Sequence, residues 1–298
     1  MILVTGRNGQ LGYEIRRAVA ALAPVTAVDA PDVRLDDPDA IRALIRKVRP
    51  SVLINTAAYT AVDQAEENPE LARAVNAVAP AVMAEELKRL GGALVHYSTD
   101  YVFDGAKSGP YAEDDAPGAL GVYGATKLAG DQAVLASGVP HLLLRTSWVY
   151  GSRGKNFVRT ILNLVGSGRS LRIVDDQHGA PTWCRLLAET TALILAMTGA
   201  VRRPAALRER GGLYNLTAAG ATSWHGFAAA ILELAPPEVR ASGGGITPVS
   251  TAEYPTKARR PANSRLDCDK IRRTFDIAPP DWQESLRLVM EEIYPPAP

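Results

Sequence analysis

Tyr123 and Lys127, in the stretch Val-Tyr-Gly-Ala-Thr-Lys, are the side chains whose types and spacing most directly indicate chemistry in this sequence. Four residues apart on a helix, they project from one face and lie close enough to interact. An ammonium group beside a phenol favours the phenolate and lowers the pKa of the phenol from about 10. Tyr123 is therefore a candidate general acid at neutral pH. Chance helical neighbours often share this spacing, so the interpretation also depends on Ser98-Thr99-Asp100 and on an N-terminal glycine-rich loop.

Short apolar runs alternate with helical patterns through the first half of the chain. Continuous rather than alternating apolar strands, separated by helices, predict a parallel sheet that is covered on both faces. Right-handed crossovers then give an α/β, doubly wound sheet, the Rossmann fold. The expected strands span residues 2–4, 25–28, 52–54, 93–97 and 141–145, and the expected helices span residues 11–22, 38–48 and 69–90, followed by the helix that carries Tyr123.

The pattern loosens after about residue 150. We expect residues 1–150 to form a dinucleotide-binding core and residues 151–298 to form mainly a smaller substrate-binding region, with some later segments packing back on the core. The two parts should form the walls of a cleft. The expected elements are a strand at 171–174, helices at 184–197, 224–234 and 282–293, a basic polar linker at 201–212 and an irregular tail at 295–298.

Composition narrows the class of protein. The 298 residues are 47% hydrophobic and 22% charged, which is typical of a globular protein, and the net charge of +1 favours neither nucleic acid nor an anionic membrane as a partner. The two cysteines, Cys184 and Cys268, are expected to be free thiols of a reducing compartment. Met1 leads directly into an apolar strand, and no apolar run approaches the ~20 residues of a membrane span, so we expect a cytoplasmic protein.

A glycine-rich loop, Gly6-Arg7-Asn8-Gly9-Gln10-Leu11-Gly12, joins the first strand to the first helix. The first glycine permits a tight turn, the second a close approach to a pyrophosphate, and the third close packing of helix on strand. The spacing differs from the commoner Gly-x-Gly-x-x-Gly, and alone it could be a turn-rich connection. Its position after an N-terminal strand favours nucleotide binding. The candidate cofactor residues here are Gly6, Asn8, Gly9, Gln10, Leu11 and Gly12.

Asp29 ends the second strand, where an acidic side chain would bond the adenosine ribose hydroxyls. This position favours NADH over NADPH, because a carboxylate repels a 2′-phosphate. Arg7 and Arg34 could offset that repulsion, so the choice between NADH and NADPH stays open. A solvated acid at a strand end is the alternative interpretation of Asp29.

Five further stretches, together with the glycine loop and Tyr123 to Lys127, carry a family resemblance. They are residues 55–63 (Asn-Thr-Ala-Ala-Tyr-Thr-Ala-Val-Asp), 96–103 (His-Tyr-Ser-Thr-Asp-Tyr-Val-Phe), 145–150 (Arg-Thr-Ser-Trp-Val-Tyr), 176–182 (Asp-Gln-His-Gly-Ala-Pro-Thr) and 258–264 (Ala-Arg-Arg-Pro-Ala-Asn-Ser). Over essentially its whole length the chain resembles the extended short-chain dehydrogenase/reductase family, and within it the dTDP-4-dehydrorhamnose reductases (dTDP-L-rhamnose synthases). The last two stretches are the more specific ones, because they lie in the substrate region.

The resemblance implies reduction of dTDP-4-dehydro-β-L-rhamnose by NADPH or NADH, the last step of dTDP-L-rhamnose biosynthesis. It implies that Tyr123 donates a proton to the keto oxygen, that Lys127 bonds the nicotinamide ribose and lowers the pKa of Tyr123, and that Thr99 helps to hold the keto oxygen. Ala57, Ala58 and Tyr59 join Tyr123 and Lys127 as implied cofactor-binding residues.

The resemblance also implies a substrate wall. Trp148 would give an apolar face to a sugar or base, with a core tryptophan as the alternative. Arg259 and Arg260 suit diphosphate recognition, although adjacent arginines are more often a solvated basic patch. Asp63 would lie with Val62 at the mouth of the cleft, or simply begin a helix. The implied substrate-binding residues are Val62, Thr99, Asp100, Tyr101, Trp148, Gln177, Ala180, Thr182, Arg259 and Arg260.

Rival functions remain open at this point. Related dehydratases place a glutamate after the aspartate of the Ser-Thr-Asp stretch, where this chain has Tyr101, so dehydration is disfavoured. Another sugar-nucleotide reductase or an epimerase of the same superfamily is disfavoured less strongly. A non-catalytic regulatory relative is a third alternative, against which the intact Thr99, Tyr123 and Lys127 count.

Some reductases of this family dimerise around Mg²⁺, which is held by glutamates of an early, a middle and the C-terminal helix. Glu14, Glu189 and Glu292 match those positions, and carboxylates are hard oxygen ligands that suit Mg²⁺. The resemblance thus implies a metal-linked homodimer. The alternative is that exposed helix faces carry these glutamates for solubility.

Overall fold

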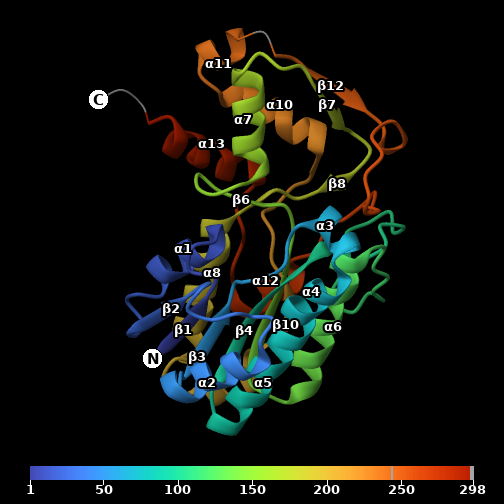
Figure 1. Ribbon diagram of the computed structural model, residues 1–298. Coiled ribbons are helices and arrows are strands. Elements are labelled where there is room, and N and C mark those ends of the chain that lie inside the picture. The colour runs from blue at the N-terminus through green and yellow to red at the C-terminus, as the bar shows by residue number, and fades with distance from the viewer. Residues whose placement is uncertain (243, 296–298) are drawn as a thin grey trace.

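A six-stranded, all-parallel sheet in the order β10-β5-β4-β3-β1-β2 forms the centre of the computed structural model, which describes residues 1–242 and 244–295 (Figure 1). The chain moves outward from β1 to β2 and then crosses to β3 on the other side of β1, which is the topological switch point of a doubly wound sheet. The predicted fold class is confirmed. The strands are β1 (Ile2–Thr5), β2 (Val25–Val28), β3 (Val52–Asn55), β4 (Ala93–Thr99), β5 (His141–Thr146) and β10 (Gly212–Asn215).

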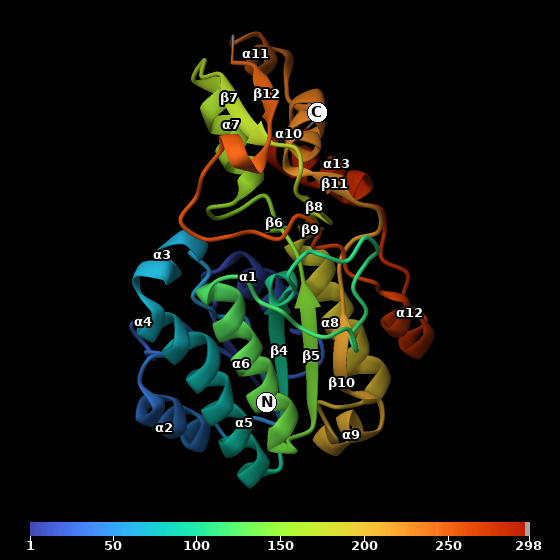
Figure 2. The ribbon, with the colours of Figure 1, turned by 90° about the vertical axis from the view of Figure 1, so that its right-hand side faces the viewer.

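Alternate side chains of each strand point to opposite faces of the sheet. Leu3, Leu53 and Leu94 pack in a cluster with side chains of α2, α5 and α6. Val4 and Ile54 pack in another cluster with side chains of α1 and α8. The sheet is therefore covered on both faces, as the continuous apolar strands predict (Figure 2). The covering helices are α1 (Gln10–Ala18), α2 (Pro38–Val48), α5 (Ala79–Leu90), α6 (Val122–Ser137) and α8 (Cys184–Thr198).

The helix predicted over residues 69–90 contains a π-helical turn. Helix α4 (Pro69–Arg73) runs into the turn Ala74–Val78 and then into α5. The turn places the buried Asn76 so that its side chain accepts a hydrogen bond from the Tyr59 N–H (2.8 Å) and donates one to the Tyr59 carbonyl (3.1 Å). Its amide also donates to Thr126 Oγ1 of α6 (3.2 Å). Asn76 thus ties the segment after β3 to the helix that carries Tyr123, and π-turns are often found at such functional sites.

A smaller lobe lies beyond the carboxyl ends of the strands (Figure 2). The chain enters it after β5, returns to the sheet for α8 and β10, leaves again after β10, and comes back once more for α12 (Asp269–Phe275). The lobe holds α7 (Phe157–Gly166), β7 (Leu171–Val174), α10 (Trp224–Leu234), α11 (Pro237–Ala241), β12 (Ile246–Val249) and α13 (Trp282–Ile293). Short strand pairs at its base are β6 (Val149–Tyr150) with β9 (Thr182–Trp183) and β8 (His178–Gly179) with β11 (Thr222–Ser223).

Among the described residues, no helix has both the length and the apolar character needed to cross a bilayer.

The sixth strand corrects the expectation of a polar linker over residues 201–212. This stretch contains a 3₁₀ turn (Pro204–Ala206) and helix α9 (Leu207–Arg210), and it leads into β10 at the edge of the sheet. Strand β10 pairs in parallel with Leu142–Arg145 of β5. Four residues without a clear apolar pattern carry little strand signal of their own, so pairing with a distant strand decides their conformation. The tail expected at 295–298 lies, beyond Pro295, outside the described residues.

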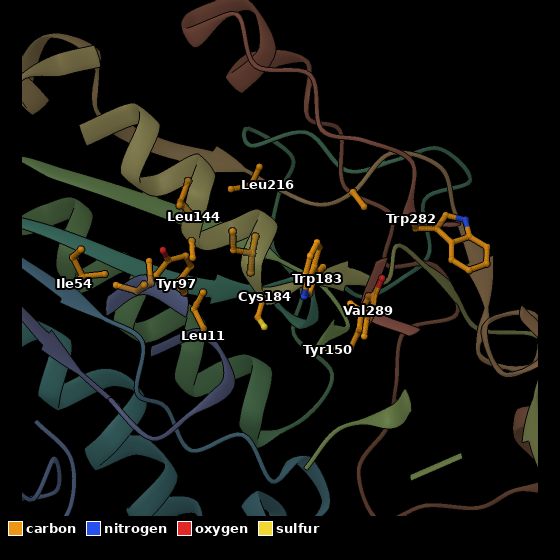
Figure 3. Close-up of a cluster of buried hydrophobic side chains, with 14 of the residues drawn as sticks. Leu11, Ile54, Tyr97, Leu144, Tyr150, Trp183, Cys184, Leu216, Trp282 and Val289 are labelled. Atoms are coloured by element: carbon orange, nitrogen blue, oxygen red, sulfur yellow. The ribbon is translucent and has the colours of Figure 1, made fainter. Parts of the chain in front are cut away.

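One apolar cluster joins the two parts of the molecule (Figure 3). Ile54 and Leu144 enter it from the sheet, Trp183 from the base of the smaller lobe, and Trp282 and Val289 from α13. Because these side chains share one core, the smaller lobe is held at a fixed position over the edge of the sheet. A cleft between the two parts is the result.

Gly130, in α6, should be intolerant of a larger side chain. A Cβ atom there would lie 2.1 Å from the carbonyl oxygen of Asn76, in backbone rather than in a flexible side chain. We expect Gly130→Ala to lower the free energy of unfolding by about 1–3 kcal/mol, measured by urea denaturation.

Gly166 provides the matched control, since it ends helix α7 and a Cβ atom there would meet nothing within 4 Å. Gly166→Ala should leave stability unchanged or raise it slightly, because alanine is the better helix former. Equal effects of the two substitutions would contradict close packing of α6 on the π-turn.

Candidate active site

A cleft of about 640 Å³ lies at the carboxyl edge of the sheet, between the sheet and the smaller lobe. Ligands of doubly wound folds bind at this edge, because loops from several strands meet there. Of the predicted residues, the cleft brings together Gly6, Asn8, Gly9, Gln10, Leu11, Asp29, Ala57, Ala58, Val62, Thr99, Asp100, Tyr101, Tyr123, Lys127 and Trp148. Residues that line it without having been predicted are Thr56, Thr60, Tyr97, Ser98, Thr146, Ser147, Val149, Gly154, Lys155 and Trp224.

The glycine loop has the geometry that a dinucleotide requires. Gly6 has φ = 81°, and a Cβ atom on it would lie 2.8 Å from Thr56 Oγ1. Gly12 lies behind the loop, where a Cβ atom would be 2.0 Å from the carbonyl oxygen of Gly6. Helix α1 begins after Gly9, and within the described chain no side chain caps its first N–H groups. These groups and the positive end of the helix dipole suit a pyrophosphate, so the loop fits the predicted nucleotide.

Asp29 lies at the end of β2 and lines the cleft, as predicted. Its carboxylate accepts a hydrogen bond from the Asn8 N–H (3.0 Å). Arg7 forms an ion pair with Asp32 (2.6 Å), and Arg34 forms one with Asp36 (2.6 Å). Both arginines considered as counter-charges to Asp29 are therefore already paired with other carboxylates.

Lys127 is almost fully buried, with 2% of its surface exposed. Its Nζ donates to the carbonyl of Tyr97 (2.6 Å) and lies 3.3 Å from His96 Nε2. Burial lowers the pKa of Lys127 to about 8, and the nearby Asp131 carboxylate opposes this shift. The ammonium group is thus directed at strand β4.

The expectation that Lys127 lowers the pKa of Tyr123 needs correction. Burial raises the pKa of Tyr123 to about 12, although the nearby Thr99 hydroxyl opposes the shift. Lys127 is directed at the Tyr97 carbonyl, so burial outweighs any effect of its charge on the phenol. In this geometry Tyr123 is a neutral phenol that carries its proton at physiological pH.

A buried hydrogen-bonded chain behind Lys127 was missed by the sequence analysis. Asn55 Oδ1 accepts from Thr5 Oγ1 (2.6 Å) and from the Ala57 N–H (3.3 Å), which turns its Nδ2 group toward His96 Nδ1 (3.1 Å). Burial and the neighbouring Lys127 hold the pKa of His96 well below its usual value, so the imidazole is neutral. The signal was present, since Asn55 and His96 both lie in the stretches that carry the family resemblance.

Thr99, Asp100 and Tyr101 form a tight turn at the end of β4. Thr99 Oγ1 accepts from the Tyr101 N–H (3.2 Å) and donates to Asp100 Oδ1 (3.1 Å). The Tyr101 ring meets the Tyr123 ring edge-on, with 5.8 Å between centroids. The turn therefore places a hydroxyl, a carboxyl and a phenol in the cleft beside the Tyr123 phenol of α6.

Two tryptophans form the opposite wall. The rings of Trp148 and Trp224 are stacked, with 3.6 Å between centroids and 7° between planes. Trp148 has φ = 45°, an unusual value for a bulky residue, and this conformation turns it into the cleft. Trp224 begins α10 in the smaller lobe and reaches the site only because the two lobes pack together.

Several predicted substrate residues are placed elsewhere. Gln177 is buried and donates to Thr251 Oγ1 (3.0 Å), while the buried Thr182 donates to the Ala180 carbonyl (3.0 Å). Gln177, Ala180 and Thr182 therefore do not line the cleft, and their hydrogen bonds lie within the base of the smaller lobe. Tyr59 is anchored through its backbone to Asn76.

The predicted arginine pair lies at the mouth of the site. Arg259 is exposed and borders a small hollow beside Val62 and Tyr101. Arg260 forms an ion pair with Asp63 (2.7 Å). Both arginines therefore lie next to residues of the cleft, Arg259 beside Val62 and Arg260 beside Tyr101, without lining it themselves.

Residues 1–294 match the family described as RmlD substrate binding domain. The chain belongs to this family. It is 44% identical over 295 residues to the dTDP-4-dehydrorhamnose reductase of Burkholderia thailandensis, with 98% of each chain covered. The solved structure of a dTDP-4-dehydrorhamnose reductase from Clostridium acetobutylicum matches with a TM-score of 0.88 at 35% identity, covering 98% of this chain and 99% of that chain. A dTDP-4-dehydrorhamnose reductase from Bacillus anthracis, solved in complex with NADP, matches with a TM-score of 0.86 at 31% identity, covering 98% of both chains. The predicted family resemblance is confirmed.

The implied Mg²⁺ site is not supported in this member of the RmlD family. Arg185, from α8, forms ion pairs with both Glu14 (3.0 Å) and Glu292. Glu189 is exposed on the same helix. Among the described residues, no group of three acidic, histidine or cysteine side chains is placed to hold a metal ion. The guanidinium group supplies the positive charge that Glu14 and Glu292 require.

The buried Lys127 of this family member should make stability depend on pH. Its pKa of about 8 in the folded protein lies below its ordinary value of 10.5, so the unfolded chain binds more protons in this window and the wild type gains stability as the pH rises. Lys127→Met removes this ionisation. The unfolding free energy of the wild type minus that of Lys127→Met should therefore increase by on the order of 2 kcal/mol between about pH 7 and about pH 10. Urea denaturation of both proteins across this pH range measures the difference.

The exposed Lys47, changed to Met in the same way, reports the effect of removing one surface charge. If the unfolding free energies of the wild type and of Lys127→Met differ by the same amount at every pH, the placement of a desolvated ammonium group at this position is contradicted.

Proposed function

We propose that this chain reduces dTDP-4-dehydro-β-L-rhamnose to dTDP-β-L-rhamnose, the last step of dTDP-L-rhamnose biosynthesis, with NADPH or NADH as reductant. The observation that carries the proposal is the convergence of Tyr123, Lys127 and Thr99 beside the glycine loop in one cleft. Relatives named dTDP-4-dehydrorhamnose reductase, matched over nearly the whole chain, support the substrate. We place the reaction in the cytoplasm, where reduced nicotinamide coenzymes are regenerated.

Bound NAD(P)H supplies the hydride for carbon 4 of the sugar. Tyr123 donates its proton to the oxygen on that carbon, for which a neutral phenol is suited. Thr99 holds the same oxygen through its hydroxyl group. Lys127, anchored on the Tyr97 carbonyl, holds the ribose of the coenzyme and keeps a positive charge near the developing anion.

The proposed coenzyme residues follow the carboxyl edge of the sheet. The loop Gly6 to Gly12 holds the pyrophosphate, Asp29 the adenosine ribose, and Ala57 and Ala58 admit the coenzyme through their small side chains. Asp29 and Asp32 together carry more negative charge than Arg7 neutralises. This net negative charge favours a ribose hydroxyl over a 2′-phosphate. Both coenzymes are proposed to serve, with the better turnover for NADH.

The proposed substrate wall combines Trp148 and Trp224, which offer a flat apolar surface to the sugar or the base. Val62, Asp100 and Tyr101 face it from the sheet side of the cleft. Arg259 and Arg260 are proposed to reach the diphosphate from the mouth of the cleft.

The function is tested by mixing the wild-type protein with dTDP-4-dehydro-L-rhamnose and either coenzyme, and following the loss of coenzyme absorbance. We expect turnover with the wild type. Tyr123→Phe should lose on the order of 10²–10⁴-fold in kcat, because it cannot donate a proton.

Tyr254→Phe is the matched control, because Tyr254 is an exposed tyrosine that does not line the cleft. This variant should keep the wild-type rate. A wild type that consumes neither coenzyme with this substrate would contradict the function. Near-normal turnover by a folded Tyr123→Phe variant would instead contradict the role of Tyr123 alone.

The arginine pair should contribute to binding more than to chemistry. If Arg259 or Arg260 bonds the diphosphate, its change to Ala should raise KM by on the order of tenfold to a hundredfold, which corresponds to a charge-assisted hydrogen bond of about 1.5–3 kcal/mol. Lysine should rescue binding only partly, because it lacks the planar fork of donors.

Titration calorimetry with dTDP checks affinity directly, and the exposed Arg202→Ala variant controls for the loss of one positive charge. Unchanged affinity in both the Arg259→Ala and the Arg260→Ala variants would place the pair on an ordinary surface.

A further inference from the structure

Asp100 is a buried carboxyl group next to the reacting centre. Only 2% of its surface is exposed, although it lines the cleft. Its Oδ2 atom has no hydrogen-bond partner among the described residues. A buried carboxylate with a free oxygen atom is costly, so the neutral carboxylic acid is the form that suits this position.

Asp100 is connected to Tyr123 through Thr99. Asp100 Oδ1 accepts a hydrogen bond from Thr99 Oγ1 (3.1 Å), and Thr99 lines the same part of the cleft as Tyr123, where its hydroxyl lowers the pKa of the phenol. Thr99 Oγ1 also accepts from the Tyr101 N–H (3.2 Å), which fixes the threonine side chain at the end of β4. A hydroxyl held between a carboxyl and a phenol can pass a proton from one to the other.

The surroundings of Asp100 keep its proton available near neutral pH. Burial raises the pKa of Asp100 to about 7, and the neighbouring Ser264 hydroxyl and the hydrogen bond from Thr99 oppose this shift. The ionisable groups beside it are Tyr101 in the same turn and Tyr123 on α6. Lys127 of α6 lines the same cleft, and Arg260 lies beside Tyr101. Lys127 is directed at the Tyr97 carbonyl and Arg260 at Asp63, so within the described residues neither cation forms an ion pair with Asp100.

We propose that Asp100 is the proton reservoir that restores Tyr123 after each turnover, acting through the Thr99 hydroxyl. The proposal rests on the function proposed above. When Tyr123 gives its proton to the sugar oxygen, an O–H bond breaks on Tyr123 and one forms on the product. Thr99 then transfers its hydroxyl proton to the tyrosinate and takes the proton of the Asp100 carboxyl. The Asp100 carboxylate regains a proton from water when the product leaves.

The proposal is tested by the pH profile of kcat for the wild type and for Asp100→Asn, which keeps the shape of the side chain but cannot supply the proton. Wild-type kcat should fall as the pH rises through about 7, where Asp100 loses its proton. Asp100→Asn should have a kcat lower by on the order of tenfold to a hundredfold, without that inflection. Its KM should change much less than its kcat.

Stability supplies a readout that does not depend on turnover. The folded pKa of about 7 lies above the ordinary value of 3.8, so in this window the folded protein binds more protons than the unfolded chain. Stability of the wild type therefore falls as the pH rises from about 4 to about 7, and Asp100→Asn escapes this loss. The melting temperature of Asp100→Asn relative to the wild type should rise across that window, whereas the exposed Asp114→Asn control should show no such rise.

The outcomes separate the two proposals. A wild type that is inactive on the sugar nucleotide contradicts the proposed function. An active wild type whose kcat and pH profile are unchanged in Asp100→Asn contradicts the proton reservoir alone. A change confined to KM also overturns the reservoir and leaves Asp100 with substrate binding alone.

Discussion

The burial of the Lys127 ammonium group is the constraint on which the site depends. Desolvating a charge is costly unless strong hydrogen-bond acceptors surround it, and here the Tyr97 carbonyl of β4 is the acceptor, 2.6 Å away. This bond fixes the rotation of α6 against the sheet. The rotation in turn places Tyr123, one turn earlier on α6, beside Thr99 at the end of β4. The chemistry of the cleft therefore follows from how one cation is accommodated.

A second buried charge, the carboxylate of Glu14, is neutralised by arginine side chains of the same chain. Glu14 is 5% exposed and accepts hydrogen bonds from Arg17 and Arg185. Arg185 also contacts Glu292 of the C-terminal helix, so one guanidinium group connects α1, α8 and α13. A planar, always charged group with several donors suits such a position better than lysine would. The same pairing neutralises Glu14 and Glu292 without a metal ion.

The cleft exists because two lobes share one apolar core. Side chains of α13 and of the β6–β9 pair join the face of the sheet that α1 and α8 cover, so the smaller lobe cannot be separated without exposing this cluster. The chain passes between the lobes several times, which adds to the coupling. Trp148 and Trp224 illustrate the outcome, since their stacked rings come from segments far apart in the chain, one following β5 and the other beginning α10 of the smaller lobe.

The sequence by itself determined the features that depend on local pattern. Continuous apolar strands and helical periodicity predicted the doubly wound sheet, and Gly6 to Gly12 predicted the nucleotide loop, because each signal lies within a few neighbouring residues. The spacing of Tyr123 and Lys127 predicted the helix face that carries them, and the motifs predicted the family.

Tertiary structure alone decided the rest. Strand β10 exists because it pairs with β5, Trp224 reaches the cleft because the lobes pack together, and Arg185 lies between Glu14 and Glu292 because three helices meet. Burial, which no single stretch of sequence reveals, raised the pKa of Tyr123 where the Lys127 neighbour alone predicted a lower value. These features depend on contacts between residues far apart in the chain and on the water that those contacts exclude.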